Sequence, residues 1–139
     1  MTRTIAPATT GLNHLGLTVN NLDQTAQFFI EVLGWQESGR DDNYPRTAVS
    51  DGQVRLTLWQ VDHNLDTQPF DRRKHIGLHH VAFTVATETQ LSSVYQKVKA
   101  HPGVAIEFAP ELVGNGPRKH MMCYEPGGLR IEFIWSGEP

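Results

Sequence analysis

The chain carries the same strand pattern twice. Residues 12–19 read LNHLGLTV, and residues 78–85 read LHHVAFTV. In both segments apolar residues alternate with polar or small ones, which is the period of a half-buried strand. A histidine, His14 or His80, stands near the start of each. Two copies are too few for a solenoid, so the pattern predicts a duplicated module.

The segments that follow each copy come in the same order. After 12–19 we expect a helix over 22–33, capped by Asn20-Asn21 and ended by Gly34, and then strands over 35–39, 46–50 and 54–61. After 79–85 we expect a helix over 88–99 and strands over 105–108, 120–124 and 129–135. Each half is therefore predicted to be a βαβββ module.

These modules define the expected domain organisation. The first module covers 11–62 and the second covers 77–136; a polar linker, 63–76, joins them, and 1–10 form a flexible leader. One such unit cannot cover its own sheet. We therefore expect an α+β fold in which two curved sheets form one half-open barrel with the helices outside.

Composition narrows the class of function. Twelve Lys and Arg against fifteen Asp and Glu give a net charge of −3, and no basic run is longer than Arg72-Arg73-Lys74, so we expect no nucleic-acid partner. No apolar run has the length of a membrane span, and the polar first residues do not resemble a signal peptide. Cys123 is the single cysteine, which excludes an internal disulfide framework. We expect a cytoplasmic protein that does not contact membranes.

Two histidines and one acid form the candidate site. His14 and His80 occupy equivalent positions, and Glu132 is a lone acid between Ile131 and Phe133 in the strand that closes the second half. Two imidazoles and one carboxylate can hold a divalent metal with open positions, as in non-haem Fe(II) oxygenases. Taken alone, each histidine also fits a structural role and Glu132 a solvated strand face. The joint pattern favours a metal: Fe(II) or Mn(II), with zinc or nickel as alternatives.

Over residues 11–136 the chain resembles the vicinal-oxygen-chelate superfamily. The resemblance rests on GLNHLGLTV around His14, FIEVLGW at the end of the first helix, LHHVAFTV around His80, and EPGGLRIEF around Glu132. It implies that these three residues are the metal ligands. The family's fourth ligand position falls on Thr57, because 54–59 aligns with 129–134 and sets Thr57 opposite Glu132. Threonine is a poor ligand, so a three-ligand site is implied.

The resemblance also suggests which residues face the substrate. In the family, the position of Met122 often faces the pocket, which would turn His120 inward as a catalytic acid or base. Tyr124, on the same face, is a further catalytic candidate at the pocket edge, and the alternative is that it covers the hairpin. A solvated loop-end histidine is the alternative for His120. Trp59 is a candidate pocket wall, with Thr57 beside it, and the alternative for Trp59 is the core. Arg118 is a candidate for holding an anionic substrate group, and the alternative is a solvated hairpin loop.

Four functions fit the resemblance. Each of the first three is an enzyme acting on a small molecule whose neighbouring oxygens bind the metal. The three-ligand set is closest to an extradiol dioxygenase, although Met122 stands where those enzymes have tyrosine. A glyoxalase- or epimerase-type enzyme needs a base, for which His120 is the candidate. A fosfomycin-type thiol transferase also uses two histidines and a glutamate, but Gly16 stands where those enzymes have threonine. The fourth is a non-catalytic drug- or metabolite-binding protein.

The resemblance further implies a homodimer. In two-module relatives the modules often pair across a dimer, so His14 would come from one chain and His80 and Glu132 from the other.

His79 precedes His80, and strand alternation predicts that it points to the opposite face.

Overall fold

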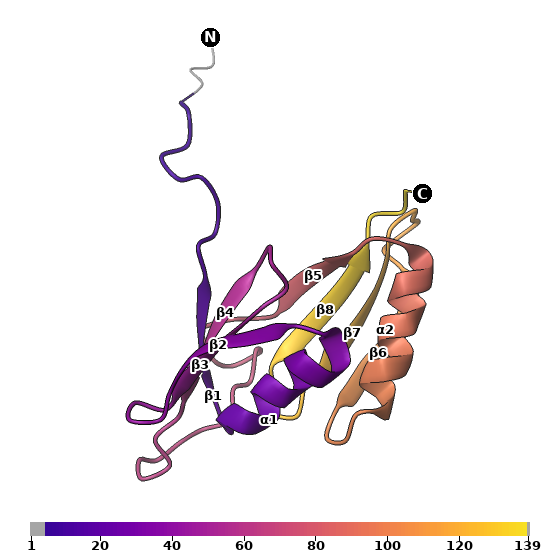
Figure 1. The fold of residues 1–139 in the computed structure, drawn as a ribbon. Coiled ribbons are helices and arrows are strands. Elements are labelled where there is room, and N and C mark those ends of the chain that lie inside the picture. The colour runs from indigo at the N-terminus through magenta and orange to yellow at the C-terminus, as the bar shows by residue number, and fades with distance from the viewer. Residues whose placement is uncertain (1–4, 139) are drawn as a thin grey trace.

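The two halves of the chain form two four-stranded sheets (Figure 1). The computed structural model describes residues 5–138; of the expected leader, residues 1–4 lie outside this range, and 5–10 form no helix or strand. The elements of the first half are β1 (Leu15–Val19), α1 (Leu22–Gln27), the π-helical turn η1 (Phe28–Val32), β2 (Gln36–Asp41), β3 (Arg46–Ser50) and β4 (Arg55–Gln60). Those of the second half are β5 (Val81–Val85), α2 (Glu88–Ala100), β6 (Ala105–Leu112), β7 (Lys119–Tyr124) and β8 (Arg130–Trp135). The predicted α+β fold of two βαβββ modules is confirmed.

The two sheets have the same topology. Sheet 1 has the order β1-β4-β3-β2, and sheet 2 has the order β5-β8-β7-β6; the sheets stay separate and do not close into a barrel. In each sheet the first strand runs parallel to the last, so Gly16 pairs with Thr57 and Ala82 pairs with Glu132. This register confirms that Thr57 occupies the place in sheet 1 that Glu132 occupies in sheet 2.

The first helix differs from the single helix expected over 22–33. The side chain of Asn21 caps α1 by accepting from the backbone N–H of Gln24. From Phe28 onward the backbone widens into η1, and both Phe28 and Phe29 are fully buried. A π-turn contains an extra residue, which lets two adjacent aromatic side chains face the core.

The modules share a core through their helix-covered faces. Phe29 and Trp35 of the first module both pack on Phe83 of β5, with ring centroids 6.1 and 5.0 Å apart. The Thr25 hydroxyl of α1 donates to the Glu125 carboxylate at 2.9 Å, and α1 lies beside the β7–β8 turn in Figure 1. Among residues 5–138 no helix is long and apolar enough to cross a bilayer.

The opposite face of each sheet carries no helix, and we call it the helix-free face. Alternation sends Leu56 and Leu58 of β4 into the core, so Thr57 and Trp59 lie on the helix-free face of sheet 1. In β8, buried Ile131 and Phe133 alternate with Glu132 in the same way. The predicted site residues of these two strands therefore lie on helix-free faces.

Candidate metal centre

Glu132 lies between two histidines on the helix-free face of sheet 2. The Nε2 of His80 is 3.5 Å from Glu132 Oε1, and the Nδ1 of His120 is 2.5 Å from Glu132 Oε2. Met122, the strand partner of Glu132, is buried. The structure thus brings together two of the three predicted ligands and places the predicted acid or base next to them.

His14 is not part of this cluster. It is exposed in the segment before β1, two residues ahead of Gly16, as His80 is two residues ahead of Ala82. Within the part of the chain that the structure describes, no three His, Cys, Asp or Glu side chains are arranged to hold a metal ion. The three predicted ligands therefore do not come together within one chain.

The ring orientations of both histidines nevertheless suit ligation. The Nδ1 of His14 is 2.7 Å from the Asn13 side-chain oxygen, and the Nδ1 of His80 is 2.7 Å from the Nδ1 of His79. In each case the preceding residue engages Nδ1 and leaves Nε2 for a metal, as is usual for metal-binding imidazoles. The donor chemistry, two Nε2 atoms and a carboxylate, fits a divalent ion.

His79 contacts His80, although strand alternation predicted that it would point away. Both residues precede β5, so the alternation of a strand does not apply to them. Desolvation, together with the positive charge of Arg130, lowers the pKa of His79. The neutral form of His79 is therefore favoured, and it can accept the N–H of His80.

A charged network borders the centre. Arg130 donates from Nε and Nη2 to the Glu107 carboxylate at 2.9 and 2.7 Å. The Tyr124 hydroxyl donates to Glu107 at 3.0 Å and accepts from Arg72 of the linker at 2.6 Å. The hydrogen bond from Arg130 is the main cause that lowers the pKa of Glu107 to about 2. The hydroxyl of Tyr124 is thus engaged by this network, and its catalytic role stays a prediction.

The sequence analysis missed the other three members of this network. Arg130 could have been predicted from the sequence, because it stands two residues before Glu132 and therefore lies on the same face of the strand. Glu107 and Arg72 could not have been, since they reach the network from β6 and from the linker through contacts between distant parts of the chain.

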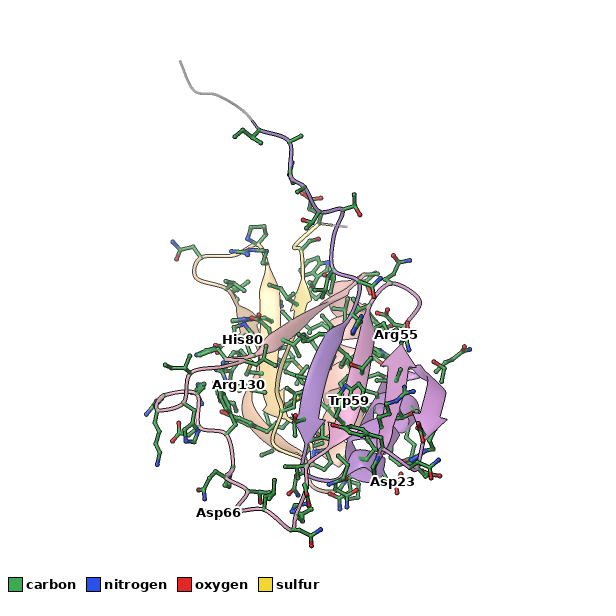
Figure 2. The ribbon with its side chains drawn as sticks, turned by 90° about the vertical axis from the view of Figure 1, so that its left-hand side faces the viewer. Asp23, Arg55, Trp59, Asp66, His80 and Arg130 are labelled. Carbon is green, nitrogen blue, oxygen red and sulfur yellow. The ribbon has the colours of Figure 1, made fainter. Side chains whose placement is uncertain are left out.

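The predicted substrate-binding residues Thr57 and Trp59 lie on sheet 1, away from Glu132. Figure 2 shows Trp59 on the strands of the first module and His80 beside the strands of the second. The indole Nε1 of Trp59 donates to the Thr57 hydroxyl at 3.1 Å. Arg118 is exposed in the β6–β7 loop, and its side chain forms no hydrogen bond or ion pair with residues 5–138. Substrate contact by these residues stays a prediction.

Two cavities lie elsewhere on the molecule. One of about 650 Å³ lies between α1 and the 101–103 loop, and its lining includes Asp23 and His101. Another of about 700 Å³ lies where β1 and β4 end, and its lining includes Tyr44 and His63. Neither is lined by a predicted metal ligand.

Comparison with known proteins identifies relatives over almost the whole chain. The family model of the Glyoxalase/Bleomycin resistance protein/Dioxygenase superfamily matches residues 11–133. The chain is 26% identical over 150 residues to a 2-epi-5-epi-valiolone epimerase from Actinomyces sp, covering 92% of this chain and 80% of that protein. It is 28% identical over 134 residues to a lactoylglutathione lyase from Neisseria meningitidis serogroup A, covering 88% of each.

A solved structure shows the same fold. The glyoxylase/bleomycin resistance protein/dioxygenase domain from Frankia sp. EAN1pec superposes with a TM-score of 0.79 at 23% identity, covering 93% of both chains. Named enzymes are therefore among the relatives of this chain, and the fold itself is shared with a solved domain of the same family.

Proposed function

The chain belongs to the Glyoxalase/Bleomycin resistance protein/Dioxygenase superfamily, and on this basis we propose that it is a metal-dependent enzyme. Its substrate would be a small molecule with two neighbouring oxygens, and its reaction a proton transfer of the isomerase or lyase kind. The observation that carries the proposal is the position of Glu132 between the imidazoles of His80 and His120. The names of the relatives, an epimerase and a lyase, support proton transfer over oxidation.

The ligands in this proposal are His80 and Glu132 of one chain and His14 of a second chain. A homodimer would then contain two equal sites. Fe(II) or Mn(II) suits the donors best, with zinc or nickel as alternatives. When bound, such an ion would hold both substrate oxygens and stabilise the negative charge that develops on them.

His120 is the proposed proton carrier. Glu132 Oε2 accepts the Nδ1 proton of His120, which leaves its Nε2 lone pair free. The contact with Glu132 also orients the imidazole, so that Nε2 is the ring nitrogen that can accept a proton. His120 would take a proton from the carbon beside the chelated oxygens and return it to the same or the adjacent carbon. Phe108, whose ring centroid is 4.9 Å from that of His120, limits the rotation of the imidazole.

A second candidate is an extradiol-type dioxygenase. One observation favours it: the Thr57 hydroxyl already accepts a hydrogen bond from Trp59, so the position equivalent to Glu132 supplies no fourth ligand. Three open positions on a metal suit a catechol and oxygen together. Oxygen uptake with catechols would favour this reaction, and exchange of substrate hydrogen with deuterated solvent would favour proton transfer.

Metal content tests the shared site directly. Wild-type protein purified without a histidine tag should contain about one divalent ion per chain. His14→Ala and Glu132→Ala should each lose it, whereas the matched control His63→Ala, at an exposed histidine of the linker, should retain it. Retention of the metal by Glu132→Ala would overturn the ligand assignment.

Mixing the two inactive variants tests the partner's contribution. Random exchange of His14→Ala and Glu132→Ala chains makes about half of the dimers mixed, and each mixed dimer has one intact site of two. The mixture should therefore recover about a quarter of the wild-type activity and metal content. A mixture that stays inactive although mixed dimers form would refute the shared site.

A further inference from the structure

Two arginine side chains converge on the helix-free face of sheet 1. Arg46 lies on β3 and Arg55 on β4. A Cβ atom placed on Gly39 of β2 would lie 3.8 Å from Nη2 of Arg55 and 3.9 Å from Nη1 of Arg46. The same Nη1 of Arg46 donates to the Gly39 carbonyl at 3.2 Å. Both guanidinium groups therefore lie next to one residue of β2.

Neither of these arginines has a carboxylate partner within residues 5–138. Arg40, Arg72 and Arg130 each lie within 4.0 Å of at least one carboxylate oxygen. No such contact exists for Arg46 or Arg55 in the described part of the chain.

Asp41 is the strand partner of Arg46, but its carboxylate accepts the backbone N–H of Asn43 and pairs with neither arginine. Two like charges that are close together and uncompensated repel each other. An anion bound between them would remove this repulsion.

The position of the pair mirrors that of the metal centre. In sheet 1, Ala48 pairs with Thr57, and the neighbouring pairs on the same face place Arg46 opposite Trp59 and Arg55 opposite Ser50. In sheet 2, Met122 pairs with Glu132, and the neighbouring pairs contain His120 and Arg130. Arg46 and Arg55 therefore flank Thr57 as His120 and Arg130 flank Glu132.

Aromatic rings border the arginine pair on the side of Arg46. The guanidinium of Arg46 lies 5.6 Å from the Trp59 ring, and Tyr44 lies edge-on to the same ring at 5.2 Å. Figure 2 shows Arg55 and Trp59 on the same module. The face thus offers two guanidinium groups bordered by aromatic rings.

We propose that Arg46 and Arg55 form an anion subsite that binds a carboxylate or phosphate group of the small-molecule ligand. Guanidinium groups present forked N–H donors that match the oxygens of both groups. In a shared-site dimer this subsite would belong to the module that supplies His14. The claim that the anion is part of the substrate rests on the proposed function, whereas binding of an oxyanion by the two arginines does not.

Calorimetric titration at low ionic strength tests the subsite with benzoate and with inorganic phosphate. Arg46→Gln and Arg55→Gln should each lower the affinity for the preferred anion about tenfold, because each removes a charge-assisted hydrogen bond. Arg73→Gln is the matched control, since Arg73 is exposed and its side chain has no ion pair in the described chain. Arg46→Lys should recover part of the affinity, which separates lost binding from a damaged fold.

The two anions tell a carboxylate subsite from a phosphate subsite, and either preference supports the proposal. Equal binding by wild type and both glutamine variants would overturn it, as would no binding of either anion by the wild type. Comparing 3,4-dihydroxybenzoate with catechol on metal-loaded protein then tests the link to the substrate. Arginine-dependent binding in which 3,4-dihydroxybenzoate gains nothing over benzoate from the metal or from Glu132 would leave the subsite standing and count against the chelating site of the proposed function.

Discussion

The hydrogen bond between Thr25 and Glu125 is the clearest test of how the two modules are joined. Thr25 is fully buried and Glu125 is 2% exposed. The carboxylate accepts from the Thr25 hydroxyl at 2.9 Å and from the backbone N–H of Leu129 at 3.0 Å. Thr25→Val preserves shape and volume but removes one of these two donors. The buried carboxylate can then regain that bond only by admitting water.

The expected cost follows from the charge of the acceptor. A hydrogen bond to a charged group contributes about 1.5–3 kcal/mol, and the loss leaves a buried charge less well solvated. For a domain of this size we expect Thr25→Val to lower the melting temperature by about 5–12 °C. Thr25→Ser retains the hydroxyl, so its melting temperature should fall by less. Thr18→Val, at an exposed threonine of β1, is the control that should leave the melting temperature unchanged.

Differential scanning calorimetry of the four proteins measures this cost. A Thr25→Val protein that melts within about 1 °C of the wild type would show that the bond contributes nothing net to stability. A double-mutant cycle with Glu125→Gln isolates the pair: the effect of Thr25→Val should shrink when the acceptor is no longer charged.

Three further predictions concern the core and the charged network. Gly127→Ala should be destabilising, because a Cβ there would lie 2.7 Å from the Glu125 carboxylate and 2.8 Å from the Thr25 hydroxyl. Thermal melting measures this loss beside Gly128→Ala, where a Cβ meets no atom within 4 Å but the backbone φ is positive. The comparison separates the steric cost from the backbone cost. Burial raises the pKa of the Cys123 thiol to about 12, so a thiol reagent at neutral pH should react only after unfolding, and rapid reaction of the native protein would contradict this burial. The pKa of Glu107 is lowered from 4.5 to about 2. Its contribution to stability is therefore present above pH 4.5 and is lost as the pH falls toward 2. The urea midpoint of unfolding should depend less on pH in this window for Glu107→Gln than for the wild type.

The duplicated architecture could be predicted because its signals are local. Strand alternation and helix capping depend on residues close in sequence, and the order βαβββ appeared twice in both the pattern and the structure. The alignment of Thr57 with Glu132 held because the two sheets share one register. Strand ends were less certain: His14 and His80 precede β1 and β5 rather than beginning them.

The features that could not be predicted depend on tertiary contacts, which no local sequence pattern reveals. The widening of the first helix at Phe28 follows from the need to bury two adjacent aromatic rings against the second module. The contact of Arg72 with Tyr124 joins the linker to β7, residues that are far apart in sequence. The convergence of Arg46 and Arg55 at Gly39 depends on the irregular pairing of β2 with β3 between Ser38 and Asp41. Sequence reasoning found the strands that carry the site but not the side chains that border it.

The two modules share one backbone plan but carry different chemistry at equivalent positions. Sheet 2 has an acid, Glu132, where sheet 1 has Thr57, and sheet 1 has a cation, Arg46, where sheet 2 has His120. Within one chain the two helix-covered faces pack on a common core, so the helix-free faces remain open. Pairing the unlike faces of two chains would set Glu132 opposite Arg46 and Arg55, which brings opposite charges together. In the proposed dimer each site would then take one wall from each module, with the proposed metal on one wall and the anion of the proposed substrate on the other.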